Sequence, residues 1–136
     1  MIRNQAGIAR GFYSEADLRV LHEWMEKYSQ EPEIGILSIE YCPRHMQGPV
    51  EKYAIDCHCR KPNPGMIENI TSRYEVGRAG SILVGDKHSD IIAGKKAGIG
   101  SRFLISSEYS RDDLVIHEPL FESLSSVVKY LGVGRA

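Results

Sequence analysis

Apolar and polar positions along the 136-residue chain alternate between strand-like and helix-like patterns. The chain opens with two apolar residues, which are followed directly by the polar residues 3–5. This pattern is typical of the carboxyl end of a buried strand, and we interpret the residues after it as a loop. Apolar residues at helical spacing then predict a helix over 14–30, with Ser14 as its cap. The stripe expected to face the core is formed by Leu18, Leu21, Trp24, Met25 and Tyr28.

The rest of the chain continues this alternation. The run SILVGD is almost wholly apolar, which is typical of a parallel strand buried on both faces. On the first long helix, we expect His22 to lie at the surface or to be partly packed. The remaining predicted elements are a strand over 36–42, a loop over 43–64, a helix over 66–76, a strand over 81–86, a helix over 89–98, a strand over 101–106 and a helix over 119–131. Such alternation predicts an α/β fold with a mostly parallel sheet.

Composition, net charge and the number of cysteines limit the classes of function that the chain can have. Hydrophobic residues make up 42% of the chain, charged residues 26%, and the net charge is −1. No bulk electrostatic field favours nucleic acid or an anionic membrane, and no apolar run approaches the roughly 20 residues of a membrane span. There are three cysteines, an odd number, and no secretion signal. We therefore expect one cytoplasmic domain that binds neither nucleic acid nor membrane.

The segment LVGDKHSD ends a predicted buried strand with an acidic residue. Ligands of parallel sheets bind at the carboxyl ends of the strands, and a carboxylate there suits Mg²⁺, which prefers oxygen donors. Asp86 is therefore a candidate Mg²⁺ ligand. The alternative is that Asp86 or Ser89 only caps the next helix. We expect Asp90 to support the loop and the helix start rather than bind the metal.

The segment CRKPNPGM places two adjacent cations on a proline-rich loop just before a predicted helix. Cations near a helix N-terminus form a phosphate site, so Arg60 and Lys61 are candidate phosphate ligands. The alternative is a solvated basic pair with no ligand.

All three cysteines of the chain lie around one loop, in the segments CPRH and CHC. Thiolates with an imidazole are a natural ligand set for tetrahedral structural zinc, so Cys42, Cys57, Cys59 and His45 are candidate zinc ligands. His58 is a poorer candidate, because it lies between two ligands. The alternative is three reduced thiols without metal.

Taken in order, NQAGIARG, CPRH…CHCRKPNPGM and LVGDKHSDIIAGKKAGI resemble motifs of the D-glycero-D-manno-heptose 1,7-bisphosphate phosphatases. These belong, with the related histidinol-phosphatases, to the haloacid dehalogenase-like superfamily. The resemblance extends to about residue 106. It implies a Rossmann-like three-layer α/β sandwich, Mg²⁺, a structural zinc loop at about 42–60, and hydrolysis of a small sugar phosphate through an aspartyl-phosphate. The implied substrate is heptose bisphosphate, which feeds lipopolysaccharide biosynthesis; the alternative is histidinol phosphate.

The resemblance also implies roles for single residues. Asn4 would lie beside the transferred phosphoryl group, and Arg60 would contact the sugar phosphate. Lys61 would neutralise the phosphate, while Asp86 would bind Mg²⁺ with Lys87 beside it. In the zinc loop the implied ligands are Cys42, Cys57 and Cys59.

The chain departs from the family pattern at three places. The family carries its nucleophile and general acid in a D-x-D motif on the first strand, and no D-x-D occurs in the 136 residues. Arg3 stands where the family has threonine, and Arg44 stands where it has the zinc-binding histidine, with His45 following. We expect residues 1–136 to be a single, N-terminally truncated hydrolase domain without its first central strand, inactive alone. A separate N-terminal fragment is then a candidate partner, and a non-catalytic module that binds phosphosugar or zinc is the alternative.

Overall fold

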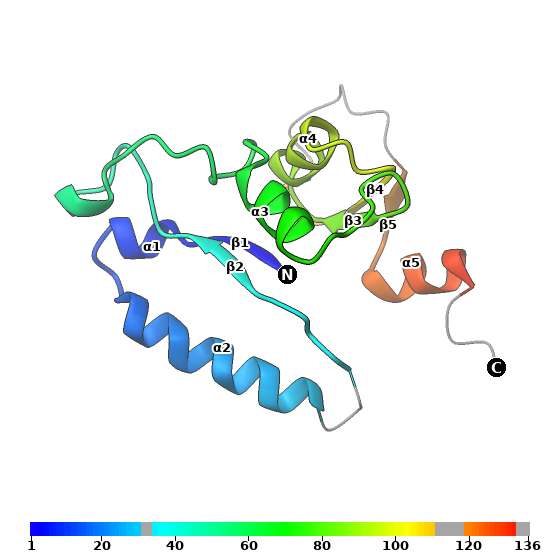
Figure 1. The fold of residues 1–136 in the computed structure, drawn as a ribbon, viewed down its shortest axis with the longest axis horizontal. Helices are drawn as coiled ribbons and strands as arrows, with labels where there is room; N and C mark the ends of the chain where they lie inside the picture. The colour runs from blue at the N-terminus through cyan, green and yellow to red at the C-terminus, as the bar shows by residue number, and fades with distance from the viewer. Residues whose placement is uncertain (31–33, 111–118, 133–136) are drawn as a thin grey trace. The chain divides into compact units, whose positions relative to one another are not determined.

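The computed structural model describes residues 1–30, 34–110 and 119–132. The chain divides into two compact units, Met1–Arg60 and Lys61–Ala136, and each is described by itself (Figure 1). Within the described ranges, no helix combines the length and the apolar character that a membrane crossing needs.

The first unit is built on a two-stranded parallel sheet. The two strands pair in register, with Ile2 opposite Glu40 and Asn4 opposite Cys42. The elements of this unit are β1 (Ile2–Asn4), α1 (Ala6–Ala9), α2 (Glu15–Gln30), β2 (Glu40–Cys42) and the 3₁₀ helix η1 (Glu51–Tyr53). The early strand end and the long helix are confirmed. The predicted strand over 36–42 is shorter than expected, and the segments expected to be loops contain α1 and η1.

The start of α2 confirms the predicted cap. The Ser14 hydroxyl accepts a hydrogen bond from the backbone N–H of Asp17 at 3.1 Å, and the Asp17 carboxylate accepts one from the backbone N–H of Ser14 at 2.8 Å. Each side chain therefore satisfies a backbone N–H of the first helical turn that has no partner within the helix.

The buried side of α2 differs from the prediction. Leu18 and His22 are only 3% and 8% exposed, whereas Leu21, Trp24 and Tyr28 are exposed. Of the two positions expected for His22, the packed one is found and the surface one is not, because its ring packs edge-on against Tyr41 with centroids 5.6 Å apart. Trp24 and Tyr28, one turn apart, instead stack on each other. Apolar periodicity therefore identified the helix but not the face that is buried, since exposed aromatic pairs produce the same pattern.

The second unit is built on a three-stranded parallel sheet of order β3–β4–β5. The elements of this unit are α3 (Gly65–Arg73), β3 (Ile82–Gly85), α4 (His88–Lys96), β4 (Ser101–Ile105), β5 (Leu120–Phe121) and α5 (Leu124–Leu131). Gly98, which the sequence places at the end of a helix, follows α4 in the left-handed conformation, with φ of +77°.

Two predictions about the second unit need correction. β3 is not buried on both faces: Ile82 is 48% exposed and the other residues of the strand are half-buried, since β3 is the edge of the described sheet. The last helix does not begin at residue 119. β5 comes first, and Ser123 then caps α5 by accepting a hydrogen bond from the backbone N–H of Ser126 at 3.2 Å. Two residues of strand are too few to produce a visible period-2 pattern.

Candidate functional site

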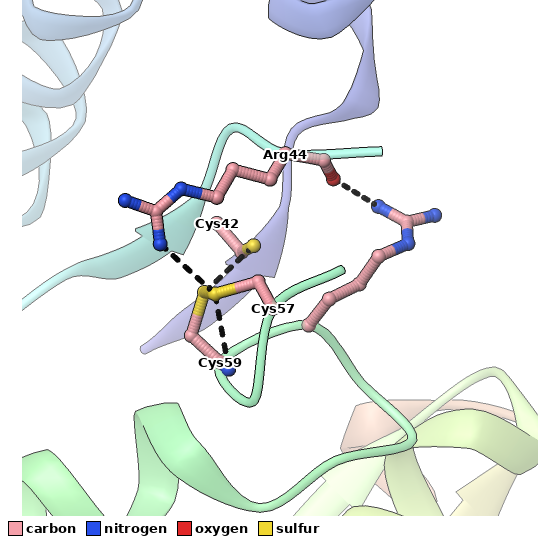
Figure 2. Close-up of a disulfide and its surroundings, with 5 residues drawn as sticks. Cys42, Arg44, Cys57 and Cys59 are labelled. Carbon is pink, nitrogen blue, oxygen red and sulfur yellow. Dashed lines mark hydrogen bonds between the residues drawn. A yellow bond between two sulfur atoms is a disulfide. The ribbon is translucent and has the colours of Figure 1, made fainter. Parts of the chain in front are cut away.

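The three cysteines of the chain come together in the first unit, at the end of β2 and in the loop after η1. Their sulfur atoms all lie within 4.8 Å of one another (Figure 2). Cys57 and Cys59 are joined by a disulfide, while Cys42 keeps its thiol. Cys42 is fully buried, and its sulfur lies 2.8 Å from that of Cys59. The cluster predicted from the sequence is therefore present as a set of three sulfurs.

A guanidinium group lies beside this cluster. Arg44 donates a hydrogen bond from its side chain to Cys57 Sγ at 3.2 Å, as Figure 2 shows. The same sulfur accepts a second hydrogen bond, from the backbone N–H of Cys59 at 3.3 Å. Arg60, a predicted phosphate ligand, donates to the backbone oxygen of Arg44 at 3.3 Å. Cys57 Sγ therefore accepts hydrogen bonds from two donors, one on a side chain and one on the backbone.

Of the two histidines near the cysteines in the sequence, neither belongs to the cluster of ligand atoms found among the described residues. His45 Nδ1 accepts a hydrogen bond from the backbone N–H of Gln47 at 3.2 Å, and the group of metal-ligating atoms found among the described residues contains the three cysteines without His45. Desolvation lowers the pKa of His45, and the positive charges of Arg60 and Arg10 lower it further. His58 is exposed. The structure therefore does not bring the predicted fourth ligand to the cluster.

The predicted residues at the start of the chain lie on β1. Asn4 is the last residue of the strand and is half-buried. Arg3, where the family has threonine, directs its guanidinium toward α2 and donates to the sulfur of Met25 at 3.5 Å.

In the second unit, the loop between β3 and α4 gathers the predicted acidic and basic residues. Asp86 follows β3 and is exposed. Asp90 is buried: one of its carboxylate oxygens accepts from the backbone N–H of Lys87 at 3.0 Å, and the other pairs with the ammonium group of Lys61 at 2.5 Å. Asp90 thus supports the helix start, as the sequence predicts, and it also holds Lys61 in place.

A turn over 107–110 contacts this loop and had no signal in the sequence. The Ser107 hydroxyl donates to the backbone oxygen of Asp86 at 3.0 Å, and His88 Nε2 lies 3.2 Å from the backbone oxygen of Ser110. The ammonium group of Lys87 lies over the Tyr109 ring, 4.2 Å from its centre. The Glu108 carboxylate raises the pKa of Tyr109, chiefly through a hydrogen bond, and the charge of Asp86 adds to it. These contacts join residues about twenty positions apart, which local patterns do not reveal.

Comparisons with known proteins agree with the resemblance. The family model described as HAD-hydrolase-like matches residues 58–127. A D-glycero-alpha-D-manno-heptose-1,7-bisphosphate 7-phosphatase of Photorhabdus laumondii is 41% identical over 131 residues, which cover 96% of this chain and 72% of that protein. The D-glycero-beta-D-manno-heptose-1,7-bisphosphate 7-phosphatase of Escherichia coli K12 is 39% identical over 105 residues, which cover 77% of this chain and 55% of that protein.

Solved structures give the same result at the level of the fold. The D,D-heptose 1,7-bisphosphate phosphatase of B. bronchiseptica, crystallised with magnesium and phosphate, matches 96% of this chain and 71% of its own, with a TM-score of 0.79 and 31% identity. A HAD-like phosphatase from Mesorhizobium loti matches 95% of this chain and 61% of its own, with a TM-score of 0.80 and 29% identity. The α/β Rossmann-like fold class is thereby confirmed. The chain belongs to the heptose-1,7-bisphosphate phosphatase family of the haloacid dehalogenase-like hydrolases.

Proposed function

We propose that this chain supplies the phosphate-holding and magnesium-holding groups of a phosphatase that acts on D-glycero-D-manno-heptose 1,7-bisphosphate. The observation that carries the proposal is the buried Asp90, which pairs with Lys61 and lies four residues after Asp86 in the loop and helix start that follow β3. A fixed ammonium group next to a carboxylate is what a Mg²⁺-dependent reaction of a phosphate ester needs, because charge must be neutralised as the phosphoryl group reacts. The magnesium and phosphate of the B. bronchiseptica structure support this assignment.

Each predicted residue has one role in this proposal. Asp86 would hold Mg²⁺, for which its exposed carboxylate fits because Mg²⁺ prefers oxygen ligands. Lys61 and Lys87 would neutralise the phosphate. Asn4 would lie beside the transferred group, and Arg60 would contact the sugar phosphate and select the substrate.

The attacking carboxylate is the part that these residues do not supply. The 136 residues contain no Asp-x-Asp pair. We therefore propose that they form one incomplete hydrolase domain and that the chain binds the sugar phosphate without hydrolysing it. Activity would need the pair from another segment, for which a separate N-terminal fragment is our candidate partner.

The test measures phosphate release and ligand binding separately. With Mg²⁺ and heptose 1,7-bisphosphate, the chain should release no phosphate, whereas calorimetry should detect binding that Lys61→Gln weakens by about tenfold or more. Co-expression with the N-terminal segment of the P. laumondii relative should restore hydrolysis. Release of phosphate by the chain alone would contradict the missing nucleophile, and absence of any binding would contradict the whole assignment. Histidinol phosphate, tested in parallel, separates the two substrates.

We also propose that the reduced cysteine cluster holds structural zinc in a cytoplasmic protein. The donor set fits, because three sulfurs within 4.8 Å of one another, two of them buried, offer thiolates to one tetrahedral ion once the disulfide is reduced. His45 would be the fourth ligand after rotation of its ring. Metal analysis of protein purified under reducing conditions should find about one zinc per chain. Cys42→Ser should abolish binding, and a metal-free wild type would refute the proposal.

A non-catalytic role is the second candidate. Arg3, which donates to Met25, occupies a position where the family has threonine, and the sequence lacks Asp-x-Asp. Both features suit a module that binds phosphosugar without reacting with it. Failure of the N-terminal segment to restore hydrolysis, with binding intact, would favour this candidate.

A further inference from the structure

We propose that Tyr109 is a positioning residue of the phosphate site, which holds the ammonium group of Lys87 where an anionic ligand can bind it. The ammonium group lies over the face of the Tyr109 ring, 4.2 Å from the ring centre. This role rests on the proposed function, because it takes Lys87 as one of the cations that neutralise the substrate phosphate. Tyr109 acts through Lys87 and takes no part in the chemistry itself.

The ring contact restrains a long and flexible side chain. Lys87 is exposed, and an exposed lysine loses conformational entropy when a ligand orders it. The negative face of an aromatic ring attracts an ammonium group, so Tyr109 reduces the number of positions that this group can take before a ligand arrives. A binding group that is ordered in advance loses less freedom on binding, and the affinity for the ligand rises accordingly.

The same contact leaves the ammonium group able to bind an anion. A lysine ammonium group carries three N–H donors and no acceptor. The Tyr109 ring covers one side of the group, and Lys87 is otherwise exposed to solvent, so a phosphate oxygen can accept from a donor that is directed away from the ring. The ring is itself 52% exposed and lies at the surface. A phosphate therefore need not displace Tyr109 in order to bind Lys87.

Two contacts hold the turn over 107–110 beside Lys87. The Ser107 hydroxyl donates to the backbone oxygen of Asp86 at 3.0 Å, and His88 Nε2 lies 3.2 Å from the backbone oxygen of Ser110. The turn is therefore attached to the residue before Lys87 and to the residue after it. The tyrosine lies between the two serines, so its ring is kept close to the lysine side chain.

Hydrogen bonds within the turn hold its backbone independently of the ring. The backbone N–H of Tyr109 donates to the Ser107 hydroxyl at 3.1 Å, and the backbone N–H of Ser107 donates to the Ser110 hydroxyl at 2.8 Å. The Ser110 hydroxyl donates to the backbone oxygen of Ser107 at 2.9 Å. These contacts use the serine side chains and the backbone. The aromatic side chain can therefore be replaced without removing the groups that shape the turn.

Lys87 is connected to the other cation that we assign to the phosphate. Its backbone N–H donates to one carboxylate oxygen of Asp90 at 3.0 Å, and the other oxygen pairs with the ammonium group of Lys61 at 2.5 Å. One buried carboxylate thus joins Lys61 to the start of α4, where the side chain of Lys87 begins. Tyr109 restrains the ammonium group of Lys87 as Asp90 restrains that of Lys61.

The test measures binding of heptose 1,7-bisphosphate with Mg²⁺ to the full chain by calorimetry. Tyr109→Leu should weaken binding about threefold, whereas Tyr109→Phe should bind as the wild type does, because phenylalanine keeps the ring face. Tyr130→Leu is the matched control: it also removes an exposed ring from the second unit, but this ring contacts Phe103 and Phe121. It should bind with the wild-type affinity.

A double variant tests whether the ring acts through the lysine. The loss of affinity caused by Tyr109→Leu should disappear in the Lys87→Gln background. In the ligand-free protein, the ring should shift the ε-methylene proton signals of Lys87 upfield, and Tyr109→Leu should remove this shift. An equal loss of affinity with and without Lys87, wild-type affinity of Tyr109→Leu, or an unchanged proton shift would each overturn the role of Tyr109 alone. Absence of any binding by the wild type would overturn it together with the proposed function.

Discussion

At the scale of single residues, Glu15 connects three elements of the first unit. Its carboxylate accepts hydrogen bonds from the hydroxyls of Tyr41 at 2.9 Å and Tyr53 at 2.7 Å, so it joins α2 to β2 and η1. We expect Glu15→Gln to lower the free energy of unfolding by about 1–2 kcal/mol, because hydrogen bonds to a charged acceptor are stronger than those to an amide. Urea unfolding measures this, with the exposed Glu23→Gln as the control.

The pH dependence of the free energy of unfolding provides a second test of the Glu15→Gln prediction. The two tyrosine hydroxyls, Tyr53 first, lower the pKa of Glu15 from its ordinary value of 4.5. Because this pKa is lower in the folded than in the unfolded state, ionised Glu15 stabilises the folded protein above pH 4.5. This stabilisation is lost as the pH falls through the pKa of the folded state. The difference between wild type and Glu15→Gln should therefore shrink under acid conditions. A difference that is constant from pH 7 to 3 would contradict the assignment.

His22 should cause a separate loss of stability at a higher pH. Burial, and then the charge of Arg3, lowers the pKa of His22 from its ordinary value of 6.5. The folded protein therefore keeps the ring neutral at pH values where the unfolded chain takes up a proton. The resulting stabilisation is present above pH 6.5 and is lost as the pH falls toward the folded value. His22→Phe, which keeps a ring against Tyr41, should remove this slope from urea unfolding between pH 8 and 5. An unchanged slope would show that His22 is not its source.

At the scale of elements, the junction of β3 and α4 depends on a close approach at Gly85. A Cβ atom at this position would lie 2.6 Å from a carboxylate oxygen of Asp90. Gly85→Ala should therefore displace Asp90 from both Lys61 and the start of α4. We expect a loss of about 1–2 kcal/mol in the free energy of unfolding and weaker phosphate binding.

Gly80 offers the matched control for this substitution. It lies in the same unit, and a Cβ atom there would meet nothing within 4 Å. Gly80→Ala should unfold like the wild type or slightly later, because alanine restricts the unfolded chain more than glycine does. Thermal unfolding and phosphate titration compare the two variants. Equal behaviour of both would mean that the approach of Asp90 to Gly85 has no energetic importance.

Local sequence patterns predicted where helices occur better than which residues are buried or in contact around them. The helix starting at Ser14 and the helix ending before Gly98 could be located because capping residues and periodicity are local in sequence. The sequence left open whether His22 is packed or at the surface, since its packing partner is Tyr41, nineteen residues away. For the same reason β5 and the turn over 107–110 that contacts Asp86 left no local signal. The cysteine cluster was predictable because all three cysteines of the chain lie near one loop.

At the scale of the whole molecule, the candidate chemistry is divided between two units that each contain a parallel sheet. The cysteine cluster and Arg60 belong to the first unit, and Lys61, Asp86 and Asp90 belong to the second. Each unit also has its own buried side chains, with Leu18 and Cys42 in the first and Met66 and Val127 in the second. The proposed zinc ligands and the groups proposed to hold Mg²⁺ therefore lie in different units, whereas Asn4 and Arg60, which we propose contact the substrate, lie in the same unit as the cysteines.

This division leads to a prediction for hydrogen exchange in the reduced full chain. The three proposed zinc ligands all lie within residues 1–60, so zinc should slow amide exchange there and leave residues 61–110 and 119–132 unchanged. With free zinc at 100 times its dissociation constant, binding adds about 2.7 kcal/mol to the free energy of any opening of the first unit that releases the metal. The slowest amides of the first unit should therefore exchange about 100-fold more slowly.

The control for this experiment is Cys42→Ser, which removes one ligand and should abolish the zinc effect without changing exchange in the second unit. Inorganic phosphate with Mg²⁺ should give the opposite pattern, with protection around β3 and α4, because the groups proposed to hold them include Lys61 and Asp86. Equal slowing of both units by zinc would contradict the separation, since it would mean that the two units open together. Protection by zinc in Cys42→Ser would place the metal elsewhere in the chain.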